Sequence, residues 1–162
     1  MTRQDHPNIS VDCVIFGFDF NQLNVLLVER KLQDTNSGNL IINDLTLAGN
    51  HVYIDEPLED AARRVLFELT GLKDIYLEQF YTTGDPDRLR KEKDQFWLQS
   101  VNKNPEDRVV SVCFFSLIDS SELKLIEKGR KVFWKPVNEV DNLAFDHKEI
   151  LLKAIEALQR KL

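Results

Sequence analysis

Alternating and continuous runs of apolar residues predict a series of β-strands in this chain. Residues 11–18 and 23–30 are strand-like and are joined through the polar pair Asn21-Gln22, which predicts a β-hairpin. Residues 25–28 are aliphatic without alternation, which predicts a strand buried on both faces. Further strands are predicted at residues 75–82, 108–118 and 131–134.

Two segments carry the signals of amphipathic helices. Residues 57–70 begin with a proline suited to the first helical position, have acidic residues in the first turn and are followed by Gly71. A second helix is predicted over residues 146–162, where Asp146 and Glu149 have the spacing of a capping box and the apolar positions share one face.

The connecting segments differ in character. Residues 31–39 are predicted to form a polar loop, and residues 40–52 mix short apolar pieces with a turn at Gly49-Asn50. Residues 84–107 are a long polar stretch, and structureless segments of this length inside a domain are functional or disordered. Strands flanked by two helices predict one α/β (α+β) layered domain with a mixed sheet over residues 1–162.

Composition narrows the classes of protein. The formal net charge of -6, from 27 acidic residues against 21 Lys and Arg, makes the chain a poor binder of nucleic acid by itself. Cys13 and Cys113 lie in apolar runs without metal-ligand spacing, so we expect reduced core cysteines rather than a disulfide. The polar N-terminus does not suit a signal peptide, and no apolar run approaches the ~20 residues that span a bilayer. We therefore expect a cytoplasmic protein with no membrane partner.

One segment, LAGNHVYIDEPLEDAARRVLFELTGL, resembles the signature of the Nudix family. That signature reads Gly, five residues, Glu, seven residues, Arg-Glu, aliphatic, any residue, Glu-Glu, any residue, Gly, aliphatic. Glu56, Arg64, Gly71 and Leu72 fix the register, and Asn50 takes the place of the first glycine. The flanking hairpin, the strand after Gly71 and the closing LAFDHKEIL also suit the family. The resemblance implies the Nudix fold, a mixed β-sheet sandwiched between helices.

The chain departs from the signature at the metal-binding positions. The family holds Mg²⁺ against a diphosphate mainly through two glutamates four residues apart, stacked on one helix face. Those positions are Val65 and Leu69 here, and aliphatic side chains neither ligate magnesium nor activate water. Glu56 and Glu68 are the residual acids of the motif. The prediction is therefore no catalytic residue, no metal site and no need for Mg²⁺ as a cofactor.

At 100° per residue, the face that would hold the metal becomes an apolar stripe and is predicted to extend the core. The stripe consists of Leu58, Ala61, Ala62, Val65 and Leu69. Asp60, Arg64 and Glu68 are spaced as a ladder along its edge. Glu56 is predicted to pair with Arg64 and to close the preceding loop onto the helix.

Several polar residues are candidates for a phosphate-binding pocket between the motif loop and the sheet. Asn50 and His51 can donate hydrogen bonds there, although His51 could equally cap the turn. Arg30 ends a central strand and could grip a phosphate bidentately, or be a solvated strand end. Arg88 and Arg108 flank the long polar segment, and could reach the same phosphates or be solvated.

Aromatic residues give a second set of candidates. Phe16, Phe18 and Phe20 recur with period two, so Phe18 and Phe20 are candidates for a wall against a base, with packing in the core as the alternative. Trp97 could stack on a ligand or belong to a dimer contact. His147 is predicted to pack at the start of the last helix.

Three segments of the sequence resemble the sensor domain of NrtR-type (Nudix-related) transcriptional regulators: VDCVIFGFDFNQLNVLLVERK, RRVLFELTGL and DRVVSV. This resemblance implies a catalytically degenerate, homodimeric ADP-ribose sensor that controls NAD metabolism as a repressor. It also implies a C-terminal winged-helix domain that binds DNA, which would lie beyond Leu162 and is absent from this chain.

Three alternatives stay open at this point. A related branch of regulators senses a sugar such as arabinose in place of ADP-ribose or another nucleotide sugar. An active hydrolase of the ADP-ribose pyrophosphatase type could use substitute ligands such as Glu56, Glu59 and Glu68. A plain interaction module with an inactive pocket is the third.

Overall fold

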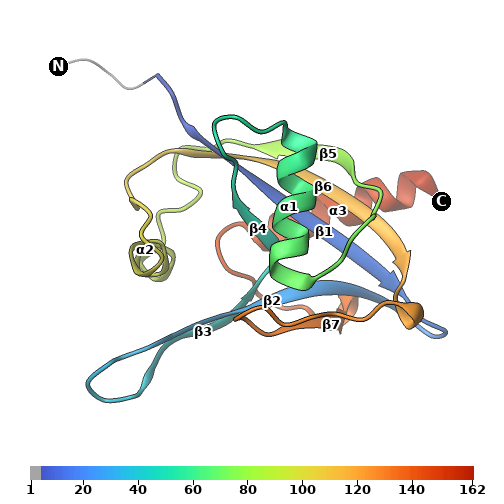
Figure 1. Ribbon diagram of the computed structural model, residues 1–162, viewed down its shortest axis with the longest axis horizontal. Coiled ribbons are helices and arrows are strands. Elements are labelled where there is room, and N and C mark those ends of the chain that lie inside the picture. Colours follow the sequence, from blue (N-terminus) through green and yellow to red (C-terminus); the bar gives the residue numbers. More distant parts are fainter. Residues whose placement is uncertain (1–4) are drawn as a thin grey trace.

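The computed structural model describes residues 5–162, and within them the chain forms a seven-stranded mixed sheet covered by helices. The strands are β1 (Asn8–Phe18), β2 (Leu23–Gln33), β3 (Leu40–Thr46), β4 (Ala48–His51), β5 (Glu78–Thr83), β6 (Val109–Asp119) and β7 (Val132–Pro136). The helices are α1 (Leu58–Thr70), α2 (Glu92–Ser100) and α3 (His147–Lys161), with single 3-10 turns η1 (Ser120–Glu122) and η2 (Val137–Glu139). Figure 1 shows α1 crossing one face of the sheet and α3 on the other.

The sheet has the order β3-β2-β1-β6-β5, with β4 also paired to β1 and β7 also paired to β2. β1 and β6 run parallel, and the other strand pairs are antiparallel. The predicted hairpin is confirmed by the antiparallel pairing of β1 with β2. The four aliphatic residues at 25–28 are fully buried, which confirms a strand covered on both faces.

The two sides of β1 contribute to two different hydrophobic cores. Val11 and Cys13 belong to the cluster that packs against α1. Val14 and Phe16 belong to the cluster that packs against α3. Because side chains alternate along a strand, Ser10 and Asp12 face the α3 side. A mixed sheet between helices confirms the predicted fold class.

The helix ends follow the sequence signals in part. Gly71 ends α1 with a φ of 77°, a left-handed conformation that glycine adopts without steric cost. Pro57 is the residue before the helix, with an extended ψ of 151°, and not its first residue as predicted. The predicted capping box at α3 is wrong, since the Asp146 carboxylate makes no bond to the helix N-terminus and instead accepts hydrogen bonds from Arg88 and Thr83.

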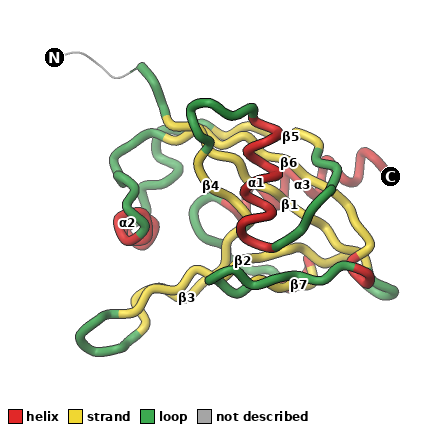
Figure 2. Tube along the Cα trace, in the orientation of Figure 1, coloured by secondary structure: helices red, strands yellow, loops and turns green. Residues whose placement is uncertain are grey.

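Two segments predicted as irregular contain regular structure. Gly49 and Asn50 lie within β4 and do not form a turn. The polar segment 84–107 contains α2, whose Leu98 packs with Leu89, Val109 and Phe145 in a small third cluster. The period-3.6 signal is weak because few apolar residues share a face of α2. Figure 2 shows this helix standing off the main sheet between two loops.

Cys13 and Cys113 are buried and free, as predicted. No helix within the described part of the chain is both long enough and apolar enough to cross a membrane.

Candidate functional site

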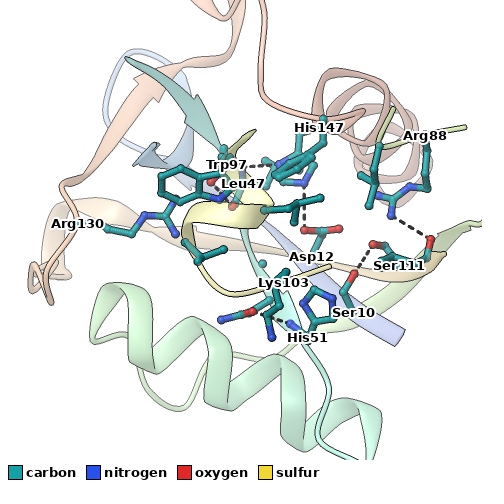
Figure 3. Close-up of a pocket in the computed structure, with 18 residues that line it drawn as sticks. Ser10, Asp12, Leu47, His51, Arg88, Trp97, Lys103, Ser111, Arg130 and His147 are labelled. Carbon is teal, nitrogen blue, oxygen red and sulfur yellow. Dashed lines mark hydrogen bonds and ion pairs between the residues drawn. The ribbon is translucent and has the colours of Figure 1, made fainter. Parts of the chain in front are cut away.

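A cavity of about 340 Å³ lies between the α3 side of the sheet and the segment that carries α2. Its buried end is formed by Ser10 and Asp12 of β1, Ser111 of β6 and His147, the first residue of α3. Figure 3 shows these side chains pointing toward one another. A group of four polar residues buried on one sheet face is unusual in a core and must be held by hydrogen bonds.

His147 and Asp12 form the centre of this buried group. The backbone N–H of Leu47 donates to Nδ1 of His147 at 3.0 Å, so that nitrogen carries no proton. Nε2 is therefore the ring nitrogen that carries a proton toward Asp12, and it lies 3.3 Å from Oδ1 of that residue. Burial by itself raises the pKa of the Asp12 carboxyl, but His147, Arg88 and Ser111 outweigh it and lower that pKa below its ordinary value. Asp12 is consequently an ionised acceptor at neutral pH.

The position of Asp12 depends on a glycine in the neighbouring strand. Gly49 lies opposite Asp12 in the β1–β4 pair. A Cβ at position 49 would lie 2.0 Å from Oδ1 of Asp12 and 2.9 Å from the backbone oxygen of Val11. Any other residue would displace the carboxylate, so Gly49 is required by close approach.

The two serines join the parallel strands beneath the cavity. Ser10 and Ser111 are register partners in the β1–β6 pair, and their hydroxyl groups are hydrogen-bonded to each other. Each hydroxyl has further capacity to donate or accept. The buried end of the cavity therefore offers one carboxylate and two hydroxyls.

The more exposed end of the cavity is cationic. Lys103 and Arg130 line it and are half-buried. Nε of Arg130 donates to the backbone oxygen of Glu29 at 2.8 Å, and its guanidinium lies 5.2 Å from the ring centroid of Trp97. Among the described side chains, neither cation is paired with a carboxylate.

Three of the predicted ligand residues line this cavity. Asn50 and His51 contribute from β4 and Arg88 from the segment before α2. Burial and the positive charge of Lys103 lower the pKa of His51, which keeps the ring neutral. Arg88 is already committed, since Nε and Nη2 donate to Asp146 at 2.9 and 2.8 Å. Asn50 and His51 therefore remain the better donors.

Arg30 requires a correction. Its side chain is fully buried, outside the cavity, and so is neither a phosphate contact nor a solvated strand end. Nε and Nη2 donate to Asp44 at 2.8 Å each, and Nη1 donates to Asp94 of α2 at 2.9 Å. The Phe145 ring lies against the guanidinium. Arg30 lies within β2 and holds α2 against β3 through Asp44 and Asp94, two acids that sequence spacing does not connect to it.

Arg108, Phe18 and Phe20 also lie outside the cavity. Arg108 is exposed, and its Nη2 donates to the backbone oxygen of Gly84 at 2.6 Å. Phe18 and Phe20 are exposed at the far end of β1, which at about 3.3 Å per residue places Phe18 roughly 20 Å from Asp12 along the strand. Phe18 and Phe20 therefore form no aromatic wall in this cavity, and Phe16 is part of the core. Trp97 and Phe145 supply the rings of the cavity.

The motif residues on α1 serve the fold. Arg64 bonds Glu56 at 2.6 Å and Glu68 at 3.1 Å, which confirms the predicted pairs. Asp60 instead lies 3.8 Å from Arg63, so the ladder is shorter than predicted.

The apolar stripe of α1 is confirmed for its central part. Ala61, Ala62 and Val65 are fully buried and Leu69 is partly buried against the same core, whereas Leu58 is exposed. Among the side chains that the structure describes, no group of three or more His, Cys, Asp or Glu is placed to hold a metal ion. The donors present on α1 therefore do not suit the magnesium ion that the motif implies.

Sequence reasoning missed Ser10, Asp12 and Ser111, and it assigned His147 to packing alone. A usable signal was present, since Ser10 and Asp12 alternate with Ile9, Val11 and Cys13 in an otherwise apolar run. Polar residues on one face of a buried strand indicate a polar cavity on that face. Lys103 and Arg130 carried no signal, because only the fold brings them together.

Comparison with known proteins gives two similar curated sequences. The ADPR-responsive transcriptional repressor NtrR of Acinetobacter baylyi is 29% identical over 98% of this chain, and the chain spans 58% of that protein's length. The ADP-ribose pyrophosphatase of Methanocaldococcus jannaschii is 26% identical over 90% of this chain and 72% of its own length.

A solved structure is similar in both fold and sequence. The Nudix domain of NrtR from Shewanella oneidensis, determined with ADP-ribose, is 27% identical with a TM-score of 0.72, over 96% of this chain and 90% of that one. The family model for the NUDIX domain matches residues 6–157, and the chain therefore belongs to the Nudix family.

Proposed function

We propose that this domain is the ADP-ribose sensor of a transcriptional regulator of NAD metabolism, and that it binds its ligand without cleaving it. The observation that carries the proposal is that the cavity and the metal-binding positions of the motif lie on opposite faces of the sheet. The cavity with its carboxylate, hydroxyls and cations lies on the α3 side of β1, whereas Val65 is buried in the core on the α1 side. Hydrolysis of a diphosphate by the family chemistry needs metal-binding acids beside the ligand.

Similarity to the NrtR Nudix domain solved with ADP-ribose supports the choice of ligand. Similarity to a repressor that responds to ADP-ribose supports the regulatory role. The proposal includes a homodimer in the cytoplasm, contact with DNA through a domain outside this chain, and no requirement for Mg²⁺. A free sugar is the second ligand to be tested, because the buried end of the cavity presents groups that bind hydroxyls.

An ADP-ribose pyrophosphatase is the competing function, and the similarity to the Methanocaldococcus jannaschii enzyme favours it. In that case Glu56, Glu59 and Glu68 would have to supply the metal ligands. Both Glu56 and Glu68 are bonded to Arg64, and Glu59 is exposed 3.8 Å from Arg63. Recruiting them would break the ion pairs that close the motif loop, which is why we prefer the sensor.

The test measures binding and cleavage in one sample. The protein is incubated with ADP-ribose and excess Mg²⁺ or Mn²⁺, bound ligand is recovered by rapid filtration, and AMP is measured by chromatography. We expect intact ADP-ribose on the protein and no AMP above a protein-free blank. The Methanocaldococcus jannaschii enzyme is the positive control. Turnover in the ordinary enzyme range of about 1 s⁻¹ or more would establish the pyrophosphatase instead.

A further inference from the structure

We infer that the cavity is polarised: Asp12, Ser10 and Ser111 at its buried end take the hydroxyl groups of a sugar and exclude phosphate, while Lys103 and Arg130 hold the phosphates at its outer end. The inference deepens the proposed function and rests on it for the identity of the ligand. The distribution of charge in the cavity rests on the structure alone.

The buried end carries the negative charge of Asp12. Asp12 is ionised, and Nδ1 of His147 beside it is occupied by a backbone hydrogen bond. Arg88, whose charge also lowers the pKa of Asp12, donates from two nitrogens to Asp146 and so shares its charge with that carboxylate. A phosphate placed against Asp12 would meet a like charge in a site of low dielectric constant, which costs far more than in water.

The same groups suit a sugar. An ionised carboxylate only accepts hydrogen bonds and has several acceptor positions, of which His147 and Ser111 occupy two. Sugar hydroxyls are donors, and hydrogen bonds to a charged acceptor are stronger than neutral ones. The Ser10 and Ser111 hydroxyls can donate or accept in turn, so adjacent hydroxyls of a ribose find partners of both kinds.

The outer end has the opposite character. Lys103 and Arg130 bring two positive charges, and among the side chains that the structure describes no carboxylate lies within ion-pair distance of either. The hydrogen bond from Nε of Arg130 to the backbone oxygen of Glu29 fixes the guanidinium. Its two terminal nitrogens have no hydrogen-bond partner among the described residues. A planar guanidinium with free nitrogens matches phosphate oxygens in a bidentate contact. Two cations balance the charge of a diphosphate.

The experiment compares Asp12→Asn with Lys103→Gln, each of which removes one unit of charge: a negative charge from Asp12 and a positive charge from Lys103. Calorimetry in EDTA measures the affinity of each protein for ADP-ribose and for inorganic pyrophosphate at millimolar concentration. We expect Asp12→Asn to lower the affinity for ADP-ribose by about tenfold, the effect of losing one hydrogen bond to a charged group. The same substitution should raise the affinity for pyrophosphate. Lys103→Gln should weaken both ligands.

Two outcomes overturn the inference. In the first, Asp12→Asn changes the affinities for both ligands in the same direction. In the second, the wild type does not bind pyrophosphate. If Asp12→Asn does not fold, Ser111→Ala replaces it and should weaken ADP-ribose while leaving pyrophosphate unchanged. An equal effect on both ligands would then overturn the inference.

The failure of the proposed function gives a different result. A wild type that binds pyrophosphate but not ADP-ribose removes the ADP-ribose sensor. The polarity is then decided by pyrophosphate alone: tighter binding by Asp12→Asn supports it and unchanged binding overturns it.

Discussion

The two faces of β1 have opposite surroundings, although the residues on them are neighbours in sequence: one face packs in a hydrophobic core and the other borders a polar cavity. Val11 and Cys13 pack under α1 in a hydrophobic core, and the motif position Val65 belongs to the same core. Asp12, one residue away from each, faces a polar cavity on the α3 side. Because side chains alternate between the two faces of a strand, one segment can stabilise the fold with one set of residues and bind a ligand with the other. In this chain the helix that carries the family motif stabilises the structure, and the candidate binding groups lie across the sheet.

The sharpest way to break this comparison is to place an acid at the motif position. Val65→Glu puts a carboxylate into the α1 core, and an unpaired buried charge costs on the order of 4 kcal/mol in the free energy of unfolding. Urea denaturation at neutral pH measures the loss. Leu69→Glu is the matched control, since Leu69 is only partly buried, and it should cost less than half as much. A loss of under about 1 kcal/mol for Val65→Glu would show that this face of α1 is open.

Arg30 tests how α2 is held beside the cavity. Arg30→Met leaves Asp94, whose side chain is 3% exposed, without its arginine partner, and we expect a loss of about 3 kcal/mol. Adding Asp94→Asn removes the isolated charge and should recover part of that stability. Both values come from urea denaturation. Equal stability of the single and double variants would contradict an ion-pair role for Arg30.

Gly49 tests the cavity side of the comparison. Gly49→Ala forces the Asp12 carboxylate aside, and overpacking of this kind costs about 1–3 kcal/mol. Gly84→Ala is the control, because a Cβ there would meet its nearest atom, in Val110, at an ordinary 3.5 Å. Thermal denaturation should separate the two variants clearly. Similar melting temperatures would show that Asp12 does not depend on the close approach.

The smallest expected effect is the dependence of stability on pH. The pKa of Asp12 is lower in the folded protein than in the unfolded chain, so on acidification the unfolded chain takes up the proton first. The stabilisation is therefore complete above the unfolded pKa of about 4 and is lost as the pH falls through the folded pKa. Wild type should lose stability more steeply than Asp12→Asn below about pH 4, measured by denaturation at several pH values. Parallel curves would contradict the ionised carboxylate.

Sequence periodicity predicted the layers of the fold well, because each layer is defined by local patterns of burial. The strands at 11–18 and 23–30 and the helix ending at Gly71 needed no distant contact to be recognised. The site was predicted less well because it is assembled from distant segments. Asp12 and His147 are in contact although they are 135 positions apart in the sequence. The sequence does not show that the Arg30 guanidinium is already bonded to Asp44 and Asp94 and so cannot bind a phosphate. Asn50 and His51 were found because they lie next to a recognisable motif.

The central claim is that protein groups alone, without a metal, bind the ligand. Calorimetry of the wild-type domain with ADP-ribose in EDTA tests it most directly. The account predicts measurable heat at one ligand per domain, with an affinity that does not change when Mg²⁺ replaces EDTA. Binding seen only with Mg²⁺ would contradict the account and would return the motif helix to the binding chemistry.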